Sequence, residues 1–471
     1  MSRNKIQFGR PKKSKPKLAE QQLSIESLSI EGRGVAKSNG KTLFVEGALP
    51  GETVTAKITQ DHKSYAQAQL IDVISASEQR IDAPCEHYSQ CGGCQLQHLS
   101  ATAQLAHKQE AVLSLLLHNA KTTPQSVETA LESPAYYYRR SARIGVNQLH
   151  QSGLAIVGFR RANSAKLLQV SHCKVLPENL SELFNQLRDS LDQIDNAKAI
   201  THVELLQGDN IGALTFRCKA QLKNAAKKTL LTLLETLSDS GITFQGYLRY
   251  DDKTVPLKQY PERLSYAIND LKLSFESGDF LQVNAQVNQQ MINRALDWLA
   301  LCKEDKILDC FAGLGNFSLP LSKQVQQVTG IEGSERMVER AAFNALLNNI
   351  DNCQFYSANL SEDIQSHSWA AKHFNKLVLD PPRSGASELI NNLFSSAIGE
   401  QLTHILYVAC DPSSLARDTK LLNENGFEMV KFCVMDMFPN TAHIESMALF
   451  CLAKPSNKTP KKAKAKTLYD Y

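Results

Sequence analysis

The order of hydrophobic and polar residues divides the chain into three regions. In residues 21–77, short runs such as residues 43–45 and 54–58 alternate apolar and polar side chains, and a Leu-Pro-Gly-Glu turn at residues 49–52 separates them. Alternation with a period of two predicts strands that bury one face. The length and the turn spacing predict a small five-stranded barrel of the OB type, a fold that binds oligonucleotides in some proteins and is a plain scaffold in others.

The second and third regions contain helices. Residues 78–270 mix helix and strand patterns, and residues 271–453 alternate apolar strands with amphipathic helices. A helix is predicted over residues 101–118 because four apolar residues share one of its faces, namely Leu105, Val112, Leu113 and Leu116. The sequence therefore predicts a Rossmann-like, doubly wound α/β domain, preceded by an OB-like β-barrel and a central α+β domain.

Composition narrows the class of protein. The chain has 471 residues, enough for two or three domains, and 42% of them are hydrophobic, as in ordinary globular proteins. The sequence contains no run of about 18 apolar residues, so it predicts no membrane-spanning helix. The basic N-terminus lacks the apolar segment of a secretory signal. Eleven cysteines are scattered along this long chain. We therefore expect a cytoplasmic protein without a membrane partner, whose cysteines act as ligands, nucleophiles or core residues.

The two ends of the chain differ from the rest in charge. Residues 1–17 contain seven basic and no acidic side chains, and residues 454–471 contain six lysines and one aspartate. Both ends are poor in apolar residues, so residues 1–20 and 454–471 are predicted to be disordered tails. Such tails either attract RNA phosphates as flexible arms or serve only as solvated ends.

A group of cysteines predicts a metal centre. Cys85, Cys91 and Cys94 lie within ten residues on a loop that contains Gly92 and Gly93, and Cys173 follows far downstream. Such a loop can point three sulfurs at one centre, and a fourth thiolate completes either an iron–sulfur cluster or a four-cysteine zinc site. Zinc ribbons usually contain two close cysteine pairs, and this chain has one. The spacing therefore favours a [4Fe–4S] cluster over zinc.

A glycine loop predicts a cofactor site. Residues 306–311 form an apolar strand that leads into Gly313 and Gly315, where the backbone can approach a ligand closely. The next strand ends in Glu332, and a carboxylate about 20 residues past such glycines is placed to bind a ribose. A dinucleotide site would have a third glycine where this chain has Ser318. The pattern therefore predicts a loop that binds S-adenosylmethionine.

Two further predicted strands end in reactive groups. The first runs into an Asp-Pro-Pro-Arg turn at residues 380–383, which resembles the fourth-strand motif of nucleic-acid methyltransferases. The second, residues 405–409, ends in Cys410 just before a predicted helix. A helix N-terminus favours the thiolate form of a nearby cysteine. We therefore interpret Cys410 as a nucleophile at the active-site edge of the sheet.

A thiolate explains how a methyltransferase acts on uracil. Carbon 5 of uracil is a poor nucleophile, but a thiolate that adds to carbon 6 leaves an enolate whose carbon 5 attacks a methylsulfonium. A base must then remove the carbon-5 proton so that the thiolate is expelled. Glu445 and His443 are both candidates for this base, and spacing does not choose between them.

Taken together, these motifs are similar to those of the RNA uracil-C5 methyltransferase family. The resemblance covers residues 21–453 and rests on the C-x5-C-G-G-C run, the D-C-F-A-G-L-G-N-F loop, the Asp-Pro-Pro-Arg turn and the segments around Cys410 and Glu445. Within the family, the chain resembles the members that methylate 23S ribosomal RNA and that contain both a TRAM domain and an iron–sulfur cluster.

The resemblance implies roles for individual residues. Cys410 would be the nucleophile and Glu445 the base. Six residues would hold S-adenosylmethionine, namely Gln282, Phe311, Asn316, Glu332, Asn359 and Asp380. Four cysteines would bind the [4Fe–4S] cluster, namely Cys85, Cys91, Cys94 and Cys173.

The resemblance also assigns the regions and shows one departure. Residues 21–77 would be the RNA-binding TRAM barrel, residues 78–270 the central domain with the cluster cysteines, and residues 271–453 the methyltransferase domain. The family usually has Cys-Asn-Pro where this chain has Cys410-Asp411-Pro412. We expect a carboxylate at Asp411 to raise the pKa of the neighbouring thiol or to change substrate contacts.

The partner implied by this chemistry is RNA. A target uridine must leave its stack to reach the cysteine, so we expect a flipped uridine in a loop of 23S ribosomal RNA, and no obligate protein partner. An interleaved run of aromatic and basic residues is a candidate for holding the neighbouring bases, or else a solvated strand edge: Tyr136, Tyr137, Tyr138, Arg139, Arg140 and Arg143.

Three other functions are open at this point. The first is methylation of another ribosomal or transfer RNA uridine by the same chemistry. The second is a non-catalytic RNA-binding assembly factor that keeps the fold. The third is a radical iron–sulfur methylthiolation enzyme, although its cysteine spacing differs.

Overall fold

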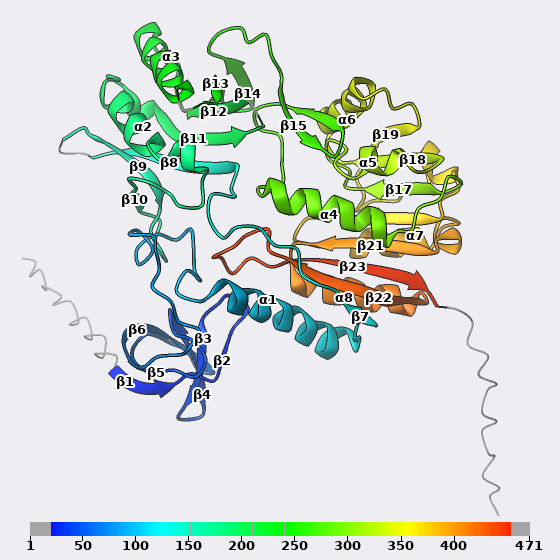
Figure 1. Cartoon of the computed structure of the whole chain (residues 1–471), viewed down its shortest axis with the longest axis horizontal. Helices are drawn as coiled ribbons and strands as arrows, with labels where there is room; N and C mark the ends of the chain where they lie inside the picture. The colour runs from blue at the N-terminus through cyan, green and yellow to red at the C-terminus, as the bar shows by residue number, and fades with distance from the viewer. Residues whose placement is uncertain (1–19, 150–151, 210, 240, 454–471) are drawn as a thin grey trace, which may run out of the picture. The chain divides into compact units, whose positions relative to one another are not determined.

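The computed structural model describes residues 20–149, 152–209, 211–239 and 241–453 (Figure 1). The two predicted tails lie outside these residues, except for Glu20, which pairs with Lys57 as the first residue of β1. Within the described residues the chain forms two compact units, one made of residues up to 84 with 95–103, and one made of residues 85–94 with 104–453. No helix among the described residues is both long and apolar enough to cross a membrane.

The first unit is a six-stranded sheet with the order β1-β5-β6-β4-β3-β2. Alternate side chains of these strands, including Leu43, Val45, Val54 and Ala56, are fully buried and form its core. The strand bounds are β1 Glu20–Ser24, β2 Ser27–Leu28, β3 Gly34–Ser38, β4 Lys41–Glu46, β5 Thr53–Asp61 and β6 Tyr65–Ser75.

We predicted five strands in this unit, and the structure has six. The backbone N–H of Ile25 donates to Glu52, but the N–H of the next residue, Glu26, donates to Val35. The chain thus changes its partner strand at this point, so that one stretch of alternating residues, 20–28, forms two strands.

The central part of the second unit is a seven-stranded sheet with the order β10-β9-β8-β11-β12-β13-β14. Helices α2 (Leu183–Asp192) and α3 (Asn224–Ser238) share a hydrophobic core with one of its faces, which includes Ile144, Val203 and Phe216. The strand bounds are β8 Ser141–Gln148, β9 Ala155–Arg160, β10 Leu167–Gln169, β11 Ile200–Gln207, β12 Ile211–Cys218, β13 Thr243–Tyr250 and β14 Lys253–Pro256.

An eight-stranded sheet forms the rest of this unit, with the order β19-β18-β17-β20-β21-β23-β22-β7. The first five strands are parallel, β23 runs antiparallel between β21 and β22, and β7 pairs in parallel with β22. The strand bounds are β7 Ser126–Val127, β17 Lys306–Cys310, β18 Gln327–Glu332, β19 Cys353–Ser357, β20 Lys376–Leu379, β21 His404–Ala409, β22 Phe427–Met435 and β23 Glu445–Leu452.

Helices and a hairpin cover both faces of this sheet (Figure 1). One face packs against α4 (Ala285–Trp298), α5 (Ser318–Ser322), α6 (Glu335–Leu347) and the hairpin of β15 (Leu264–Ile268) and β16 (Leu271–Phe275). The other face packs against α7 (Ser387–Phe394), α8 (Pro412–Glu424) and part of α1 (Ala101–Leu115). The predicted doubly wound α/β domain and the predicted helix that begins at Ala101 are therefore confirmed; this helix ends in a π-helical turn, Leu116–Ala120.

Candidate active site at the carboxyl edge of the parallel sheet

Parallel strands end at the same edge of a sheet, and this edge brings together most of the predicted site residues. Phe311 follows β17, Glu332 ends β18, Asp380 follows β20 and Cys410 follows β21. Because β23 is antiparallel, its first residue, Glu445, reaches the same edge. A nucleophile, acidic groups and a glycine loop from distant parts of the sequence therefore share one edge.

Cys410 and Glu445 are neighbours across two strands. The last residues in register between β21 and β23 are Ala409 and Ser446, so the next pair along the antiparallel ladder is Cys410 and Glu445. Cys410 is half-buried, and its thiol donates to the Pro381 carbonyl at 3.8 Å. Burial, together with Glu445 and Asp380, raises the pKa of this thiol to about 12. The free site therefore holds a neutral thiol beside a carboxyl group.

Asp411, which departs from the family pattern, caps a helix. Its carboxylate accepts the backbone N–H of Ser414 at 2.8 Å at the start of α8, where aspartate and asparagine are equally good caps. The groups that raise the pKa of Cys410 are instead Glu445 and Asp380, after burial. The carboxylate of Asp411 thus has a local structural role that the sequence alone did not reveal.

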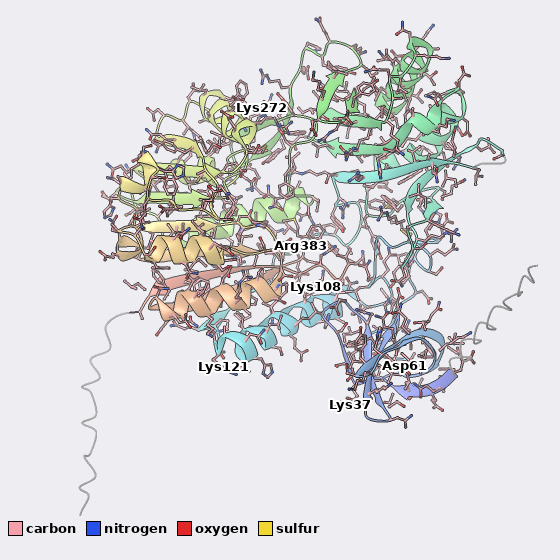
Figure 2. The ribbon with its side chains drawn as sticks, turned by 180° about the vertical axis from the view of Figure 1, so that it is seen from behind. Lys37, Asp61, Lys108, Lys121, Lys272 and Arg383 are labelled. Atoms are coloured by element: carbon pink, nitrogen blue, oxygen red, sulfur yellow. The ribbon has the colours of Figure 1, made fainter. Side chains whose placement is uncertain are left out.

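Several charged groups surround Glu445. Burial and Asp380 raise the pKa of Glu445 well above its usual range, while Arg383 and Lys108 act in the opposite direction. Arg383 lies within hydrogen-bond distance of His443 Nδ1, at 3.1 Å, and Phe438 packs against the His443 ring. Figure 2 labels Arg383 and Lys108, which come from the Asp-Pro-Pro-Arg turn and from α1. The geometry thus pairs Glu445 with the cysteine, whereas His443 contacts Arg383.

Sequence reasoning did not single out Lys108, although it lies on the predicted helix. Its side chain is fully buried, and its ammonium donates to Asp436 at 2.8 Å and to the Phe438 carbonyl at 3.0 Å. Gln104, one turn earlier, exchanges two hydrogen bonds with Asn440. α1 therefore holds the segment that leads into Glu445. The sequence did contain a signal for this role, because Lys108 lies on the apolar face of the predicted helix, between Leu105 and Val112.

The glycine loop leaves room for a ligand. Phe311 and Gly313 have positive φ angles of 66° and 55°, and a Cβ atom on Gly313 would meet no heavy atom within 4 Å. Glu332 accepts the backbone N–H of Gly313 at 3.1 Å and that of Ser334 at 3.0 Å. A carboxylate has about four acceptor positions, so it still has capacity for ribose hydroxyls.

Two aspartates border this loop, the fully buried Asp309 and the half-buried Asp380. Burial raises the pKa of Asp380 to about 7, and burial also raises the pKa of Asp309 to about 7 against the opposing hydrogen bond from Ser318. Within the described residues, the second carboxyl oxygen of Asp309 is buried without a hydrogen-bond partner. Sequence reasoning missed Asp309, although it opens the glycine motif. A polar nucleoside-like ligand fits these three features: the unpaired oxygen of Asp309, the open space at Gly313 and the free acceptor capacity of Glu332.

The other three predicted cofactor residues are placed differently. The Asn316 amide is engaged with the Tyr266 hydroxyl at 2.9 Å and with Asn288 in both directions. Asn359 is exposed and forms a local turn with Ser361 and Glu362. Gln282 is half-buried, and its carbonyl accepts from Arg140 at 2.8 Å. Asn316 therefore joins the loop to α4 and β15, and its side-chain amide is engaged in hydrogen bonds with these two elements.

The predicted cluster cysteines belong to one region of the second unit. Burial raises the pKa of Cys91, and Cys85 adds to this rise. Burial also raises the pKa of Cys173 to about 11, with smaller contributions from Cys85 and Cys91. Cys94 and Cys85 both raise the pKa of Tyr136, after burial. Within the described residues the four sulfurs are not all within 4.8 Å of one another.

A group of three possible metal ligands lies beside these cysteines. Glu86, His87 and His172 each offer an atom within 4.8 Å of the others. All three also contact the Ser171 hydroxyl, and the backbone N–H of Ser171 donates to His87 at 3.1 Å. The hydrogen bonds around Ser171 explain this group without an ion.

The predicted aromatic and basic run is only partly exposed. Tyr137 and Arg143 are exposed, whereas Tyr138 and Arg140 are buried. Arg140 stacks on the Tyr266 ring, 4.5 Å from its centroid, and Tyr138 donates to the Pro439 carbonyl at 3.1 Å. A single RNA-binding patch made of all six residues is therefore wrong, because the backbone alternates between solvent and core.

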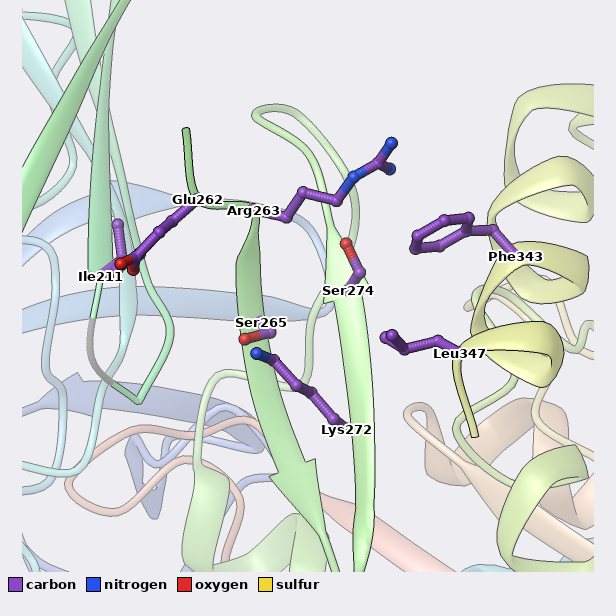
Figure 3. A pocket seen from close by; sticks show the side chains of 8 residues that line it. All are labelled: Ile211, Glu262, Arg263, Ser265, Lys272, Ser274, Phe343 and Leu347. Atoms are coloured by element: carbon purple, nitrogen blue, oxygen red, sulfur yellow. The ribbon is translucent and has the colours of Figure 1, made fainter. Parts of the chain in front are cut away.

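A pocket of about 420 Å³ lies away from this edge, between the β15–β16 hairpin and α6 (Figure 3). α6 begins near the carboxyl edge at Glu335, and the pocket residue Phe343 lies about 12 Å further along the helix at 1.5 Å per residue. Arg263 stacks over the Phe343 ring at 4.3 Å. The pocket therefore contains none of the predicted catalytic groups.

Comparison with known proteins identifies the family. The model of the tRNA (uracil-5-)-methyltransferase family matches residues 100–452, and that of the TRAM domain matches residues 18–71. The 23S rRNA (uracil(1939)-C(5))-methyltransferase RlmD of Aeromonas hydrophila is 39% identical over 88% of this chain and 93% of that protein. The RlmD protein of Psychromonas ingrahamii is 40% identical over 89% and 93%.

A solved structure shares the fold. The tRNA (uracil-54, C5)-methyltransferase of Pyrococcus abyssi, in complex with S-adenosyl-L-homocysteine, superposes with a TM-score of 0.69 and 21% identity, and the match covers 91% of this chain and all of that one. The family match spans most of the chain, and the relatives match it over nearly their full length. The chain therefore belongs to the family of S-adenosylmethionine-dependent RNA uracil-C5 methyltransferases.

Proposed function

We propose that the protein methylates carbon 5 of uridine 1939 in 23S ribosomal RNA, in the cytoplasm. The relatives that are about 40% identical over 88–89% of the chain bear this activity in their names. The observation that carries the proposal is the cross-strand pair of Cys410 and Glu445 beside the glycine loop. This pair provides the nucleophile and the base that carbon-5 chemistry on uracil requires.

The proposed reaction uses each group once. The Cys410 thiol releases its proton to solvent, and its sulfur adds to carbon 6 of the flipped uracil. The electron pair of the carbon 5–carbon 6 double bond then moves onto the carbonyl oxygen as an enolate. S-adenosylmethionine supplies a methyl group on a positively charged sulfur. Carbon 5 forms a bond to this methyl group as the methyl–sulfur bond breaks, and neutral S-adenosylhomocysteine leaves. Glu445 then removes the carbon-5 proton, the double bond re-forms, and the carbon–sulfur bond to Cys410 breaks.

The carboxyl edge supplies the binding groups for the methyl donor. Glu332 has free acceptor capacity for ribose hydroxyls, and Gly313 leaves open space next to it. We assign Gln282, Phe311, Asn359 and Asp380 to the same site on family resemblance. We assign Asn316 a positioning role, because its amide already bonds to Tyr266 and Asn288.

We further propose that Cys85, Cys91, Cys94 and Cys173 hold a [4Fe–4S] cluster. The support is the donor set of four thiols, together with the effect of Cys85 on the pKa of Cys91 and of both residues on the pKa of Cys173. One zinc ion would hold its sulfurs only about 3.8 Å apart, given Zn–S bonds of about 2.3 Å. In this proposal, residues 21–77 contact RNA, residues 78–270 bind the cluster and residues 271–453 catalyse the reaction.

The test is methyl transfer from labelled S-adenosylmethionine to unmodified 23S ribosomal RNA, followed by mapping of the modified nucleotide. We expect 5-methyluridine at position 1939, and none with the Cys410→Ala protein. Label on a transfer RNA instead would keep the chemistry and reject the substrate. Label on 23S ribosomal RNA that persists in the Cys410→Ala protein would reject Cys410 as the nucleophile.

A further inference from the structure

The face of the seven-stranded sheet that α2 and α3 leave uncovered carries a row of arginines. Arg143, Arg160, Arg217 and Arg249 lie on four adjacent or nearly adjacent strands, β8, β9, β12 and β13. Arg143 and Arg217 pair in register with Glu204 and His202 of β11, which lies between β8 and β12. Residues in register point to the same side of a sheet, so these side chains share one face. We call the four arginines the arginine face.

Like charges face one another on this surface. Arg217 and Arg249 are direct partners in the parallel pair of β12 and β13, and the register of β8 and β9 continues to Arg143 opposite Arg160. Direct like-charge pairs destabilise a sheet. A surface with only a structural role would alternate its charges, so this arrangement calls for an anionic partner.

One carboxylate serves three of the four arginines. Glu204 lies 3.4 Å from Arg217, 3.8 Å from Arg249 and 3.9 Å from Arg143. Burial lowers the pKa of His202, with contributions from Arg143, Arg217 and Arg160, so this histidine is neutral at pH 7. The face therefore keeps a net charge of about three positive units. The side chains of Arg143, Arg217 and Arg249 are 54%, 34% and 29% exposed.

The arginine face adjoins the loop that leads to the candidate active site. The Arg249 guanidinium lies 3.5 Å from where a Cβ atom of Gly278 would stand. The hydroxyls of Thr215, on the same face of β12, and of Ser277 form a hydrogen bond. Residues 277–284 then run through Gln282 to the start of α4. A polymer bound on this face can thus continue into the carboxyl edge of the parallel sheet.

We propose that the arginine face binds phosphates of the substrate RNA on the side of the flipped uridine. Four strand steps of about 4.8 Å separate Arg160 from Arg249, so the row spans about 19 Å and can contact successive phosphates. Guanidinium groups suit phosphate oxygens because they donate in pairs. Such contacts position the RNA without reading its sequence. The inference rests on the proposed function only in that the substrate is RNA.

The experiment compares two double variants of the full-length protein. Arg143→Gln with Arg217→Gln removes two charges from the arginine face. Lys223→Gln with Lys228→Gln removes two exposed charges at α3, which packs against the opposite face. The affinity for a 23S ribosomal RNA fragment is measured by filter binding between about 50 and 200 mM salt, and the binding of S-adenosylmethionine is measured by calorimetry.

We expect the arginine variant to bind RNA about tenfold more weakly and to lower the salt slope by about one unit for each lost phosphate contact. Its affinity for S-adenosylmethionine should be unchanged, and the lysine variant should match the wild type. Equal RNA affinity and salt slope in all three proteins would overturn the proposal, as would equal losses in both variants.

A third variant has the opposite expected sign and covers the case of a misfolded double variant. Glu204→Gln removes the carboxylate that pairs with three of the four arginines, so RNA binding should tighten severalfold. Unchanged or weaker binding, in a protein with a wild-type melting temperature, would contradict the proposal. Because these measurements use binding and not methylation, a different modified nucleotide would change the proposed function and leave this inference standing.

Discussion

At the scale of residues, Glu445 opposes the ionisation of Cys410, its neighbour on the adjacent strand. Glu445 raises the pKa of Cys410, and the half-buried Glu445 has a raised pKa itself. The Glu445→Gln variant should therefore ionise Cys410 more readily and speed its alkylation by iodoacetamide at pH 8. The same variant should lose turnover by about 10²- to 10⁴-fold, because nothing removes the carbon-5 proton. Slower alkylation, measured by mass spectrometry of the Cys410 peptide, would contradict the pairing.

Arg383 should act on Cys410 in the other direction. It lowers the pKa of Cys410, so Arg383→Gln should raise that pKa and slow the alkylation of Cys410 at each pH below about 9. Arg383→Lys keeps the positive charge and is the matched control. An alkylation profile that does not move toward higher pH in the glutamine variant would exclude this charge effect.

Asp309 makes the stability of the fold depend on pH. Its pKa is about 7 in the folded protein and about 4 in an unfolded chain. The folded state therefore binds this proton more tightly, so the stabilisation is complete below about pH 4 and is lost as the pH rises through 7. The melting temperature without S-adenosylmethionine should fall between pH 5 and 8. The fall should be smaller in Asp309→Asn, and an identical fall would show that other groups cause it.

At the scale of elements, α1 determines where the base-bearing segment lies. Lys108→Met should leave Asp436 buried without its partner and cost about 3–5 kcal/mol of stability, measured by urea unfolding. It should also lower kcat more than it raises KM, because the segment before Glu445 loses its support. Lys108→Met with Asp436→Leu should recover much of the stability. If the double variant also recovered full kcat, the ion pair would have no positioning role.

The sequence predicted elements better than their side-chain environments. Apolar runs and glycines located β17, β18, β20 and β21, and the parallel order placed Cys410 and Asp380 at one edge. Alternation failed at residues 136–143, where Arg140 lies in the core although its neighbours suggested a surface. A buried arginine depends on Tyr266 and Gln282, which are more than 100 residues away, so no local pattern reveals it.

The choice between His443 and Glu445 also needed tertiary structure. Both residues lie within three positions of one another, and both suit proton transfer. Only the antiparallel register of β23 with β21 brings Glu445 opposite Cys410. The same holds for Asp411, whose role as a helix cap becomes visible only with its bond to Ser414.

At the scale of the whole molecule, the cysteine region and the reaction site belong to one compact unit. If the four thiols bind a cluster, iron-loaded protein should absorb broadly near about 400 nm. Cys91→Ser should lose this absorbance and most of the bound iron. Cys302→Ser, at an exposed cysteine elsewhere, should keep both. Iron content measured on anaerobically purified protein checks the prediction, and equal iron in both variants would reject this ligand set.

The position of β23 has a consequence for how the protein folds during its synthesis. β23 is synthesised after β21 and β22, yet it lies between them, so β22 is connected to the parallel strands only when β23 inserts. A nascent chain that already contains Cys410 therefore lacks its base. A cysteine nucleophile without that base would form a covalent adduct with RNA that could not be released. Because the inserting strand itself begins with Glu445, attachment and release become possible in the same folding step.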